Sequence, residues 1–269
     1  MHQTFEIFGL TLKAYSTMAY MAAIAGAVLV WRPLRRAGLS PLRALALLVC
    51  MCAAFLVGAR LWNVAISPEN YKGSLKWWSL RMAGLSLYGG VLGAGLVLFA
   101  FSRIRRVGMM RLLDGFAAPS GIAFCIARVG CFLNGCCAGV ETDGPFGVVF
   151  PSKTKTVPLG PFGTFKIEHA VHPTQLYELA GALIGIPLAI LLAKKLRLRE
   201  GARFLIYGAW FCLVRLAVLP LRSLGYGELV TKVIYPALYL LLAALCVVLL
   251  IAREKKKPAA DEAGGGTEN

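Results

Sequence analysis

The stretch ALALLVCMCAAFLVGARLW, residues 44–62, decides the kind of protein that this sequence encodes. A helix needs about 20 predominantly apolar residues to cross the hydrocarbon core of a bilayer. This stretch supplies them with one charge, Arg60, near its end. The whole chain of 269 residues is 58% hydrophobic and 16% charged. Soluble domains are roughly half apolar and about a quarter charged, so the composition predicts an integral membrane protein.

Comparable stretches recur along the chain and predict an all-α fold of seven transmembrane helices. Each span is expected to be helical, because a helix satisfies its own backbone hydrogen bonds where no water is present. We place the spans at residues 11–31, 44–62, 84–101, 113–133, 173–193, 204–221 and 233–252. Residues 1–252 then form one transmembrane domain, and residues 253–269 a tail that is first basic and then disordered.

The connections between the spans differ in positive charge on the two sides of the membrane. One set holds about twice as many lysines and arginines as the other, and cytoplasmic loops are those that retain positive charge. The richer set comprises residues 32–43, 103–111, 194–203 and 253–257. This distribution predicts an N-terminus outside and a C-terminus in the cytoplasm. The outside segments 63–83 and 138–171 are expected to form a small periplasmic head.

The formal net charge of +16 raises the question of a nucleic-acid partner. We expect none, because the basic residues lie in connections that face anionic lipid headgroups and form no separate basic domain. The N-terminus has only Lys13 before the first apolar stretch and no small-residue cleavage pattern. We therefore expect no removable signal peptide and a first stretch that stays in the membrane.

Several ionisable residues fall within or at the ends of the predicted spans, toward the outer half of the bilayer. They include Arg60, Arg128, Glu178 and Arg215. An ionisable side chain inside a span is costly, so it indicates either function or a buried partner. Several arginines with one acid leave surplus positive charge, which suits a phosphate such as a phospholipid headgroup. The alternative is that Glu178 pairs with one arginine only to hold helices together.

The stretch RVGCFLNGCCAG, residues 128–139, combines charge, an amide, glycines and three thiols at the outer end of the fourth span. Cys131, Cys136 and Cys137 leave three interpretations open: a metal site, a redox-active thiol pair, or three inert small residues. The nearby histidines are His169 and His172. No second cysteine pair at zinc-finger spacing accompanies the thiols, so we predict neither a metal nor a cofactor.

The stretch HPTQLYE, residues 172–178, leads into the fifth span from outside. Pro173 fits the first turn of a helix, which places His172 at the start of that helix, close to the membrane surface. A histidine there can bind an anion or exchange a proton, or it can merely cap the helix.

These two stretches together resemble the prolipoprotein diacylglyceryl transferase family, bacterial membrane enzymes that begin lipoprotein maturation. The family signature GRxGNFxNGExxG is matched in register at Arg128, Gly130, Phe132, Asn134, Gly135 and Gly139. The second stretch is similar to the family's HPSQLYE segment. Further likenesses extend over most of the chain and include Tyr15, Arg60, Asp114, Arg215 and Arg222.

The resemblance implies transfer of a diacylglyceryl group from phosphatidylglycerol to the lipobox cysteine of a prolipoprotein signal peptide, in the bacterial cytoplasmic (inner) membrane. Arg128, Arg215 and also Arg222 would stabilise charge on the departing phosphate. Tyr88 or His172 would position substrate or accept the thiol proton. The residues that the resemblance assigns to substrate binding are Tyr15, Arg60, Asn134, Gly135, Gly139, Gln175, Tyr177, Glu178 and Arg222.

The chain departs from the family pattern at positions close to the chemistry. Tyr88 stands in place of the family's histidine, Cys131 in place of an asparagine, and Cys136 in place of the signature glutamate. Leu219 stands where a glutamate usually falls. Two other functions therefore stay open: a non-catalytic paralogue that binds lipid or signal peptides, and a thiol-based membrane oxidoreductase or metal carrier.

Overall fold

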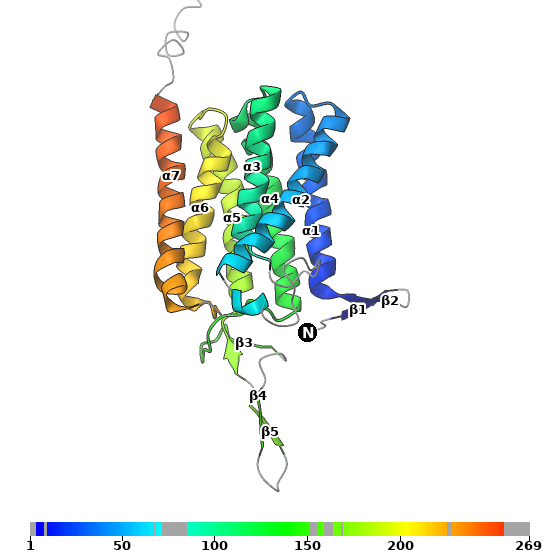
Figure 1. Cartoon of the computed structure of the whole chain (residues 1–269). Helices are drawn as coiled ribbons and strands as arrows, with labels where there is room; N and C mark the ends of the chain where they lie inside the picture. The colour runs from blue at the N-terminus through cyan, green and yellow to red at the C-terminus, as the bar shows by residue number, and fades with distance from the viewer. Residues whose placement is uncertain are drawn as a thin grey trace, which may run out of the picture.

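The computed structural model describes residues 4–7, 10–66, 68–71, 85–150, 155–158, 164–167, 169–224 and 227–255. In these ranges, seven helices are long and apolar enough to cross a membrane, which confirms the predicted fold class. The helices stand side by side as one bundle, with the N-terminal strands at one end and the end of α7 at the other (Figure 1). These are named the head end and the tail end below.

Successive helices run in opposite directions through the bundle. Their bounds are α1 Ala14–Arg36, α2 Pro41–Ile66, α3 Leu87–Arg105, α4 Met109–Leu133, α5 Thr174–Lys195, α6 Ala202–Val218 and α7 Tyr235–Lys255. A 3-10 turn at Leu219–Leu221 extends α6, and a π-helical turn at Val230–Ile234 precedes α7. The helices α1, α3, α5 and α7 end in arginines or lysines beyond the predicted limits. Such side chains reach water with their charge while their stems stay against apolar neighbours.

Short antiparallel strand pairs lie at the head end, a feature that the apolar periodicity did not predict. The pairs are β1 (Thr4–Ile7) with β2 (Leu10–Lys13), β3 (Val148–Val149) with β6 (Ala170–Val171), and β4 (Lys155–Pro158) with β5 (Thr164–Ile167). Strands β3, β4 and β5 project from the bundle in Figure 1. The predicted head segment 138–171 therefore contains β-structure.

Two other predicted segments lie partly beyond the described residues. In the predicted segment 63–83, residues 63–66 end α2 and Pro68–Tyr71 form a 3-10 turn. Residues 67 and 72–83 lie outside the described part of the chain. In the predicted tail 253–269, residues 253–255 belong to α7, and residues 256–269 lie outside the described part.

Glycines let α2 and α3 pack with their backbones in contact. A Cβ on Gly58 of α2 would overlap the carbonyl oxygen of Gly89, and a Cβ on Gly93 of α3 would overlap that of Ala54. Small residues at such contacts are typical of helix packing in membranes, where close approach holds the helices together. On the other side of the bundle, α1 packs mainly against α4, and α5, α6 and α7 follow in sequence.

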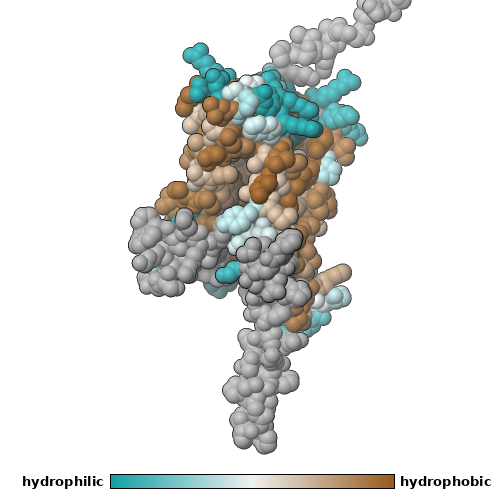
Figure 2. All heavy atoms as spheres, turned by 90° about the vertical axis from the view of Figure 1, so that its right-hand side faces the viewer, coloured by the Kyte–Doolittle hydropathy of each residue, from teal (hydrophilic) through white to brown (hydrophobic). Residues whose placement is uncertain are grey.

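The sides of the bundle present apolar side chains to the surroundings. Figure 2 shows hydrophobic residues along the sides and hydrophilic residues gathered at the tail end. Exposed residues in the middle of helices include Val28, Val57, Leu96 and Leu241. Such a surface suits contact with lipid, as expected of a multi-pass membrane protein.

An apolar cluster holds α1 to α4 together at the tail end. Leu34, Leu47, Leu98 and Leu112, one from each helix, are at most 2% exposed. The buried charged residues of the described chain are Arg60, Arg128, Glu178 and Arg215. All four lie toward the head end of their helices, so the polar centre is confined to one end of the bundle.

The basic residues at the tail end predict how the protein is oriented in the membrane. We expect the tail end in the cytoplasm, because positive loops are retained there. Alkaline phosphatase needs disulfides that form only outside the cytoplasm. Fused after Lys255, it should be inactive, whereas inserted after Asp143 in the head it should be active. The reverse pattern would show the opposite orientation.

Candidate active site

Glu178 is the centre of a buried ion cluster at the head end of the bundle. Pro173, with a φ of −77°, precedes α5, which begins at Thr174. This start places Glu178 about one turn into the helix, where it is 1% exposed. Its carboxylate forms ion pairs with arginines from three other segments. They are Arg128 of α4, Arg215 of α6 and Arg222, which follows the 3-10 turn after α6.

All three arginines contact the Glu178 carboxylate directly. Arg128 Nη2 lies 2.7 Å from Oε2, and Arg222 Nη1 donates to Oε1 at 2.6 Å. Arg215 Nη1 also donates to Oε1. The arginine side chains are 7% to 10% exposed. One carboxylate balances one of three positive charges, and the surplus is costly in a buried site unless an anion binds there.

Arg215 uses each of its side-chain nitrogens for contacts within the protein. Its Nε donates to the hydroxyl of Tyr239 at 3.2 Å, and its Nη2 donates to the hydroxyl of Tyr88 at 3.1 Å. The Tyr88 ring stacks on Tyr235, with ring centroids 5.3 Å apart. Arg215 therefore connects α3, α5, α6 and α7, and each of its three nitrogens already has a partner within the protein.

Arg128 and Arg222 keep donors that the protein does not use. In the described part of the chain, each directs one terminal nitrogen to Glu178, and the remaining side-chain nitrogens have no protein acceptor. The Arg128 guanidinium also lies over the Phe124 ring, 4.8 Å from its centroid, a cation–π contact that helps to hold it in place. Unused donors beside surplus positive charge suit a phosphate.

The turn after α4 and the start of α5 form one structural unit. Gly135 and Cys137 have left-handed φ values of 67° and 60°. For Cys137, which carries a Cβ, this conformation costs roughly 1 kcal/mol. Thr174 Oγ1 donates to the Cys137 carbonyl at 2.8 Å, and Gln175 Nε2 donates to the Cys136 carbonyl at 2.6 Å. These bonds join the two stretches that the sequence analysis singled out.

Gly139 lets three segments meet beside the ion cluster. Its N–H donates to the His172 carbonyl at 2.8 Å, and its backbone forms a β-bridge with Arg222. A Cβ at Gly139 would overlap the Leu221 carbonyl and lie 2.7 Å from the Cβ of His172. Asn134 caps the C-terminus of α4 a few residues earlier. The close approach at Gly139 therefore fixes Arg222 relative to the start of α5.

The same turn gathers the three thiols. The Sγ atoms of Cys131, Cys136 and Cys137 lie within 4.8 Å of one another, and the three cysteines are free. Cys131 is buried in the last turn of α4, while Cys137 is exposed. Hydrogen bonds from the Cys131 and Cys136 thiols, helped by the charges of Arg128 and Arg222, lower the pKa of the Cys137 thiol.

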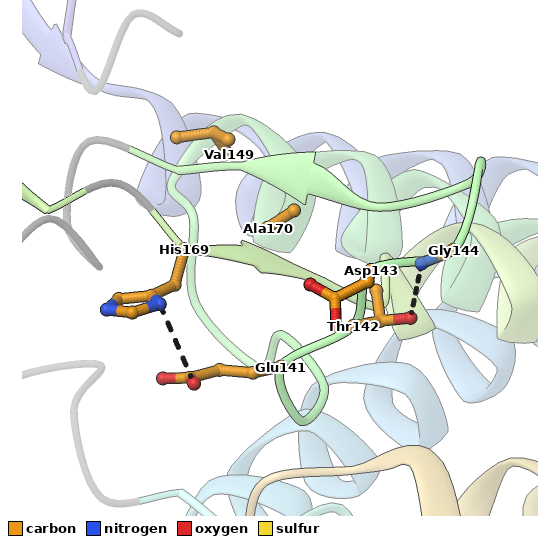
Figure 3. A pocket seen from close by; sticks show the side chains of 7 residues that line it. All are labelled: Glu141, Thr142, Asp143, Gly144, Val149, His169 and Ala170. Atoms are coloured by element: carbon orange, nitrogen blue, oxygen red, sulfur yellow. Dashed lines mark hydrogen bonds and ion pairs between the residues drawn. The ribbon is translucent and has the colours of Figure 1, made fainter.

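The histidines occupy two different places. His172 Nδ1 lies 3.3 Å from the Tyr177 hydroxyl, at the start of α5. His169 lies in the head, where its Nδ1 is 3.7 Å from Glu141 Oε2. Figure 3 shows the side chains of His169 and Glu141 facing each other beside a cavity of about 420 Å³. Because Glu141 and Asp143 line this cavity, it does not suit a phosphate, and the arginine cluster is the better candidate site.

Three further residues from the sequence analysis have distinct environments. Tyr15, near the start of α1, lies close enough to the three thiols to interact with them electrostatically. Arg60, near the end of α2, is 8% exposed. Asp114 lies at the tail end, where its carboxylate accepts hydrogen bonds from the N–H groups of Gly201 and Phe204 at 2.8 and 3.1 Å. Asp114 therefore caps α6 and lies away from the candidate site.

Three residues that contribute to the site were not identified in the sequence analysis. Tyr239 could have been identified, since its hydroxyl lies in an aliphatic span and a buried hydroxyl needs a partner. Phe124 precedes Arg128 by one helical turn, a spacing that places two side chains on one helix face. Thr174 lies in the HPTQLYE stretch, but its bond to the Cys137 carbonyl could not be predicted, because the partner is a backbone group.

The fold and the site together define a multi-pass membrane protein with a positively charged centre at one end of its bundle. A family model described as prolipoprotein diacylglyceryl transferase matches residues 2–252. The chain belongs to this family of transferases, which confirms the resemblance found in the two motifs.

Curated proteins named phosphatidylglycerol–prolipoprotein diacylglyceryl transferase are similar to the chain over most of its length. The one from Enterococcus faecalis is 32% identical over 222 residues, covering 81% of this chain and 78% of that protein. The one from Dehalococcoides mccartyi is 29% identical over 218 residues, covering 80% and 79%. The one from Caulobacter vibrioides is 34% identical over 183 residues, covering 62% and 54%.

The ion cluster predicts a large loss of stability when its acid is removed. Glu178→Gln leaves three buried arginines without a carboxylate, which costs about 3–5 kcal/mol. We expect the melting temperature in detergent to fall by roughly 10 °C. The control Glu228→Gln, whose side chain is 85% exposed, should shift it by less than about 2 °C. Equal shifts in the two variants would contradict a stabilising role for Glu178.

Proposed function

We propose that this protein transfers a diacylglyceryl group from phosphatidylglycerol to the lipobox cysteine of prolipoprotein signal peptides, the first step of lipoprotein maturation. The observation that carries the proposal is the group of three arginines around the single carboxylate of Glu178. Membership of the transferase family supports the reaction class. We place the site at the outer face of the bacterial cytoplasmic membrane, because the basic tail end is expected in the cytoplasm.

The surplus positive charge matches the change that the phosphate undergoes in this reaction. The cysteine sulfur bonds to the glyceryl carbon while the bond from that carbon to the phosphate oxygen breaks. The phosphodiester of the lipid carries one negative charge, and the released phosphate monoester carries about 1.5 to 2. Fixed guanidinium groups therefore stabilise the departing phosphate more than the bound lipid, which lowers the barrier.

The contacts divide the arginines between two roles. Arg128 and Arg222 have unused donors and would bind the phosphate. Arg215 would act as a positioning residue, since its nitrogens hold Glu178, Tyr88 and Tyr239. This assignment keeps Arg128 and Arg222 in the phosphate role expected from the sequence and gives Arg215 a positioning role instead.

Gln175 supplies a polar group of a different kind. Its side chain is fully buried, and its Oε1 has no hydrogen-bond partner in the described part of the chain. A buried acceptor without a donor is uncommon, so a ligand hydroxyl is a natural partner. The glycerol headgroup of phosphatidylglycerol carries such hydroxyls, and Gln175 would bind one of them once the side chains that cover its Oε1 move aside.

Substitution of Arg128 tests the phosphate role directly. We expect Arg128→Ala to lower the rate of thioether formation about 100- to 1,000-fold, because a fixed donor to the leaving group is lost. The assay follows the mass of a lipobox peptide incubated with purified protein and phosphatidylglycerol. The control Arg111→Ala removes an arginine that is 56% exposed at the tail end and should keep the rate.

Two outcomes of this assay would argue against the proposal. An unchanged rate in Arg128→Ala would exclude phosphate stabilisation by that residue. No product with the unaltered protein, although lipid or peptide binds, would identify the non-catalytic paralogue instead.

Substitution of Tyr88 separates positioning from proton transfer. Its hydroxyl oxygen accepts a hydrogen bond from Arg215 Nη2, so the hydroxyl can still donate to a lipid oxygen. Loss of that one bond in Tyr88→Phe should lower kcat/KM by roughly tenfold and leave the pH profile unchanged. A loss of about 100-fold or more with an altered pH profile would instead indicate a general base.

A further inference from the structure

The three thiols beside the arginines have no part in the reaction as described so far. Their Sγ atoms lie within 4.8 Å of one another, the only such group of three potential metal ligands in the described residues. Zinc–thiolate bonds are about 2.3 Å long, so the sulfurs of a tetrahedral site lie about 3.8 Å apart. Small side-chain rotations bring the observed thiols to that spacing.

The backbone around the thiols is held by buried contacts. Cys137 keeps a left-handed φ of 60°, which glycine would adopt at lower cost. Thr174 and Gln175, each at most 1% exposed, donate to the Cys137 and Cys136 carbonyls. These bonds satisfy buried carbonyls and hold the turn that carries Cys136 and Cys137 in one conformation, which limits the positions of the two sulfurs.

The three cysteines differ in how deeply they are buried. Cys131 is buried, Cys136 is partly buried and Cys137 is exposed. An ion bound by the three sulfurs would be enclosed on the side of Cys131 and open on the side of Cys137. Three protein ligands and one open position are typical of catalytic zinc sites, while structural sites have four protein ligands.

The charges near the thiols also suit such an ion. Three thiolates and one Zn²⁺ sum to a single negative charge, and a fourth thiolate adds another. Arg128 lies one turn before Cys131 in α4, and Arg222 forms a β-bridge with Gly139, two residues after Cys137. Three arginines, the Glu178 carboxylate and a zinc ion bound by three thiolates sum to one positive charge, which matches the single negative charge of a lipid phosphodiester.

The convergence of the three thiols departs from the sequence-based expectation of no metal. We propose that Cys131, Cys136 and Cys137 bind one Zn²⁺ and that the cysteine of the lipobox substrate becomes its fourth ligand. The second half of this proposal rests on the proposed transferase function. A thiol that binds zinc is deprotonated, so its proton passes to water without a general base. This accounts for a tyrosine at position 88, which is a weak base.

The zinc-bound thiolate then takes part in the transfer reaction. Its sulfur forms the bond to the glyceryl carbon, and the bond from that carbon to the phosphate oxygen breaks. The electron pair of the broken bond leaves with glycerol phosphate, beside Arg128 and Arg222. Zinc keeps its oxidation state throughout, so the step needs no oxidant or reductant.

Metal content tests the first half of the proposal. Full-length protein purified in detergent without chelator should contain about one zinc per chain by mass spectrometry of the elements. Cys131→Ser, Cys136→Ser and Cys137→Ser should each lose most of it. The controls Cys125→Ser and Cys212→Ser remove buried thiols elsewhere in α4 and α6 and should retain it. Melting temperatures show which variants are folded.

Substrate coordination is tested with cobalt, which gives zinc–thiolate sites a visible spectrum. After replacement of zinc by Co²⁺, a lipobox peptide with cysteine should raise the thiolate-to-cobalt absorption by roughly a third, as a fourth sulfur joins three. The same peptide with serine should leave it unchanged. This measurement needs no turnover, so it stands apart from the transferase assay.

Several results would overturn the proposal. Protein without zinc, zinc retained by folded Cys131→Ser, or a disulfide among the three cysteines would each exclude the metal site. An unchanged cobalt spectrum with the cysteine peptide would exclude thiol activation. Peptide coordination without any thioether product would instead refute the transferase function while leaving the zinc site in place.

Discussion

The buried carboxylate of Glu178 is the interaction on which the head end of the molecule depends. It draws together arginines from α4, α6 and the segment after α6, and Arg215 extends the contacts to Tyr88 of α3 and Tyr239 of α7. Without this acid, like charges would repel one another in a site that water cannot screen well. Glu178 both holds the helices together and sets the direction of the guanidinium groups. The structural role and the functional role that the sequence suggested for it are therefore compatible.

The sequence predicted those features of the fold that follow from the membrane as solvent. The length and low polarity of the apolar stretches were enough to predict seven spans, because a polar backbone in hydrocarbon has few alternatives to a helix. The positions of Arg128, Glu178 and Arg215 were likewise visible, since charge is conspicuous in an apolar run. The strand pairs β3–β6 and β4–β5 were not predicted, because two to four residues carry too little periodicity to detect.

The internal arrangement of the site was harder to predict than its composition. Spacing along the chain showed that Cys131, Cys136 and Cys137 were neighbours in sequence, but their convergence depends on left-handed φ at Gly135 and Cys137. A left-handed φ is common for a glycine, but at Cys137 it cannot be predicted from the residue type. Similarly, only the structure separates Arg215, whose nitrogens are all engaged, from Arg128 and Arg222.

The cap that Asp114 forms on α6 fixes how far along the helix Arg215 lies from the tail end. It fixes the start of the helix at Gly201 and Phe204, and Arg215 follows Phe204 by about 17 Å of helix. Each residue added or removed between these points would rotate Arg215 by about 100° around the helix axis. The length of α6 is therefore constrained as strictly as its chemistry, because an insertion within the helix would turn Arg215 away from Glu178.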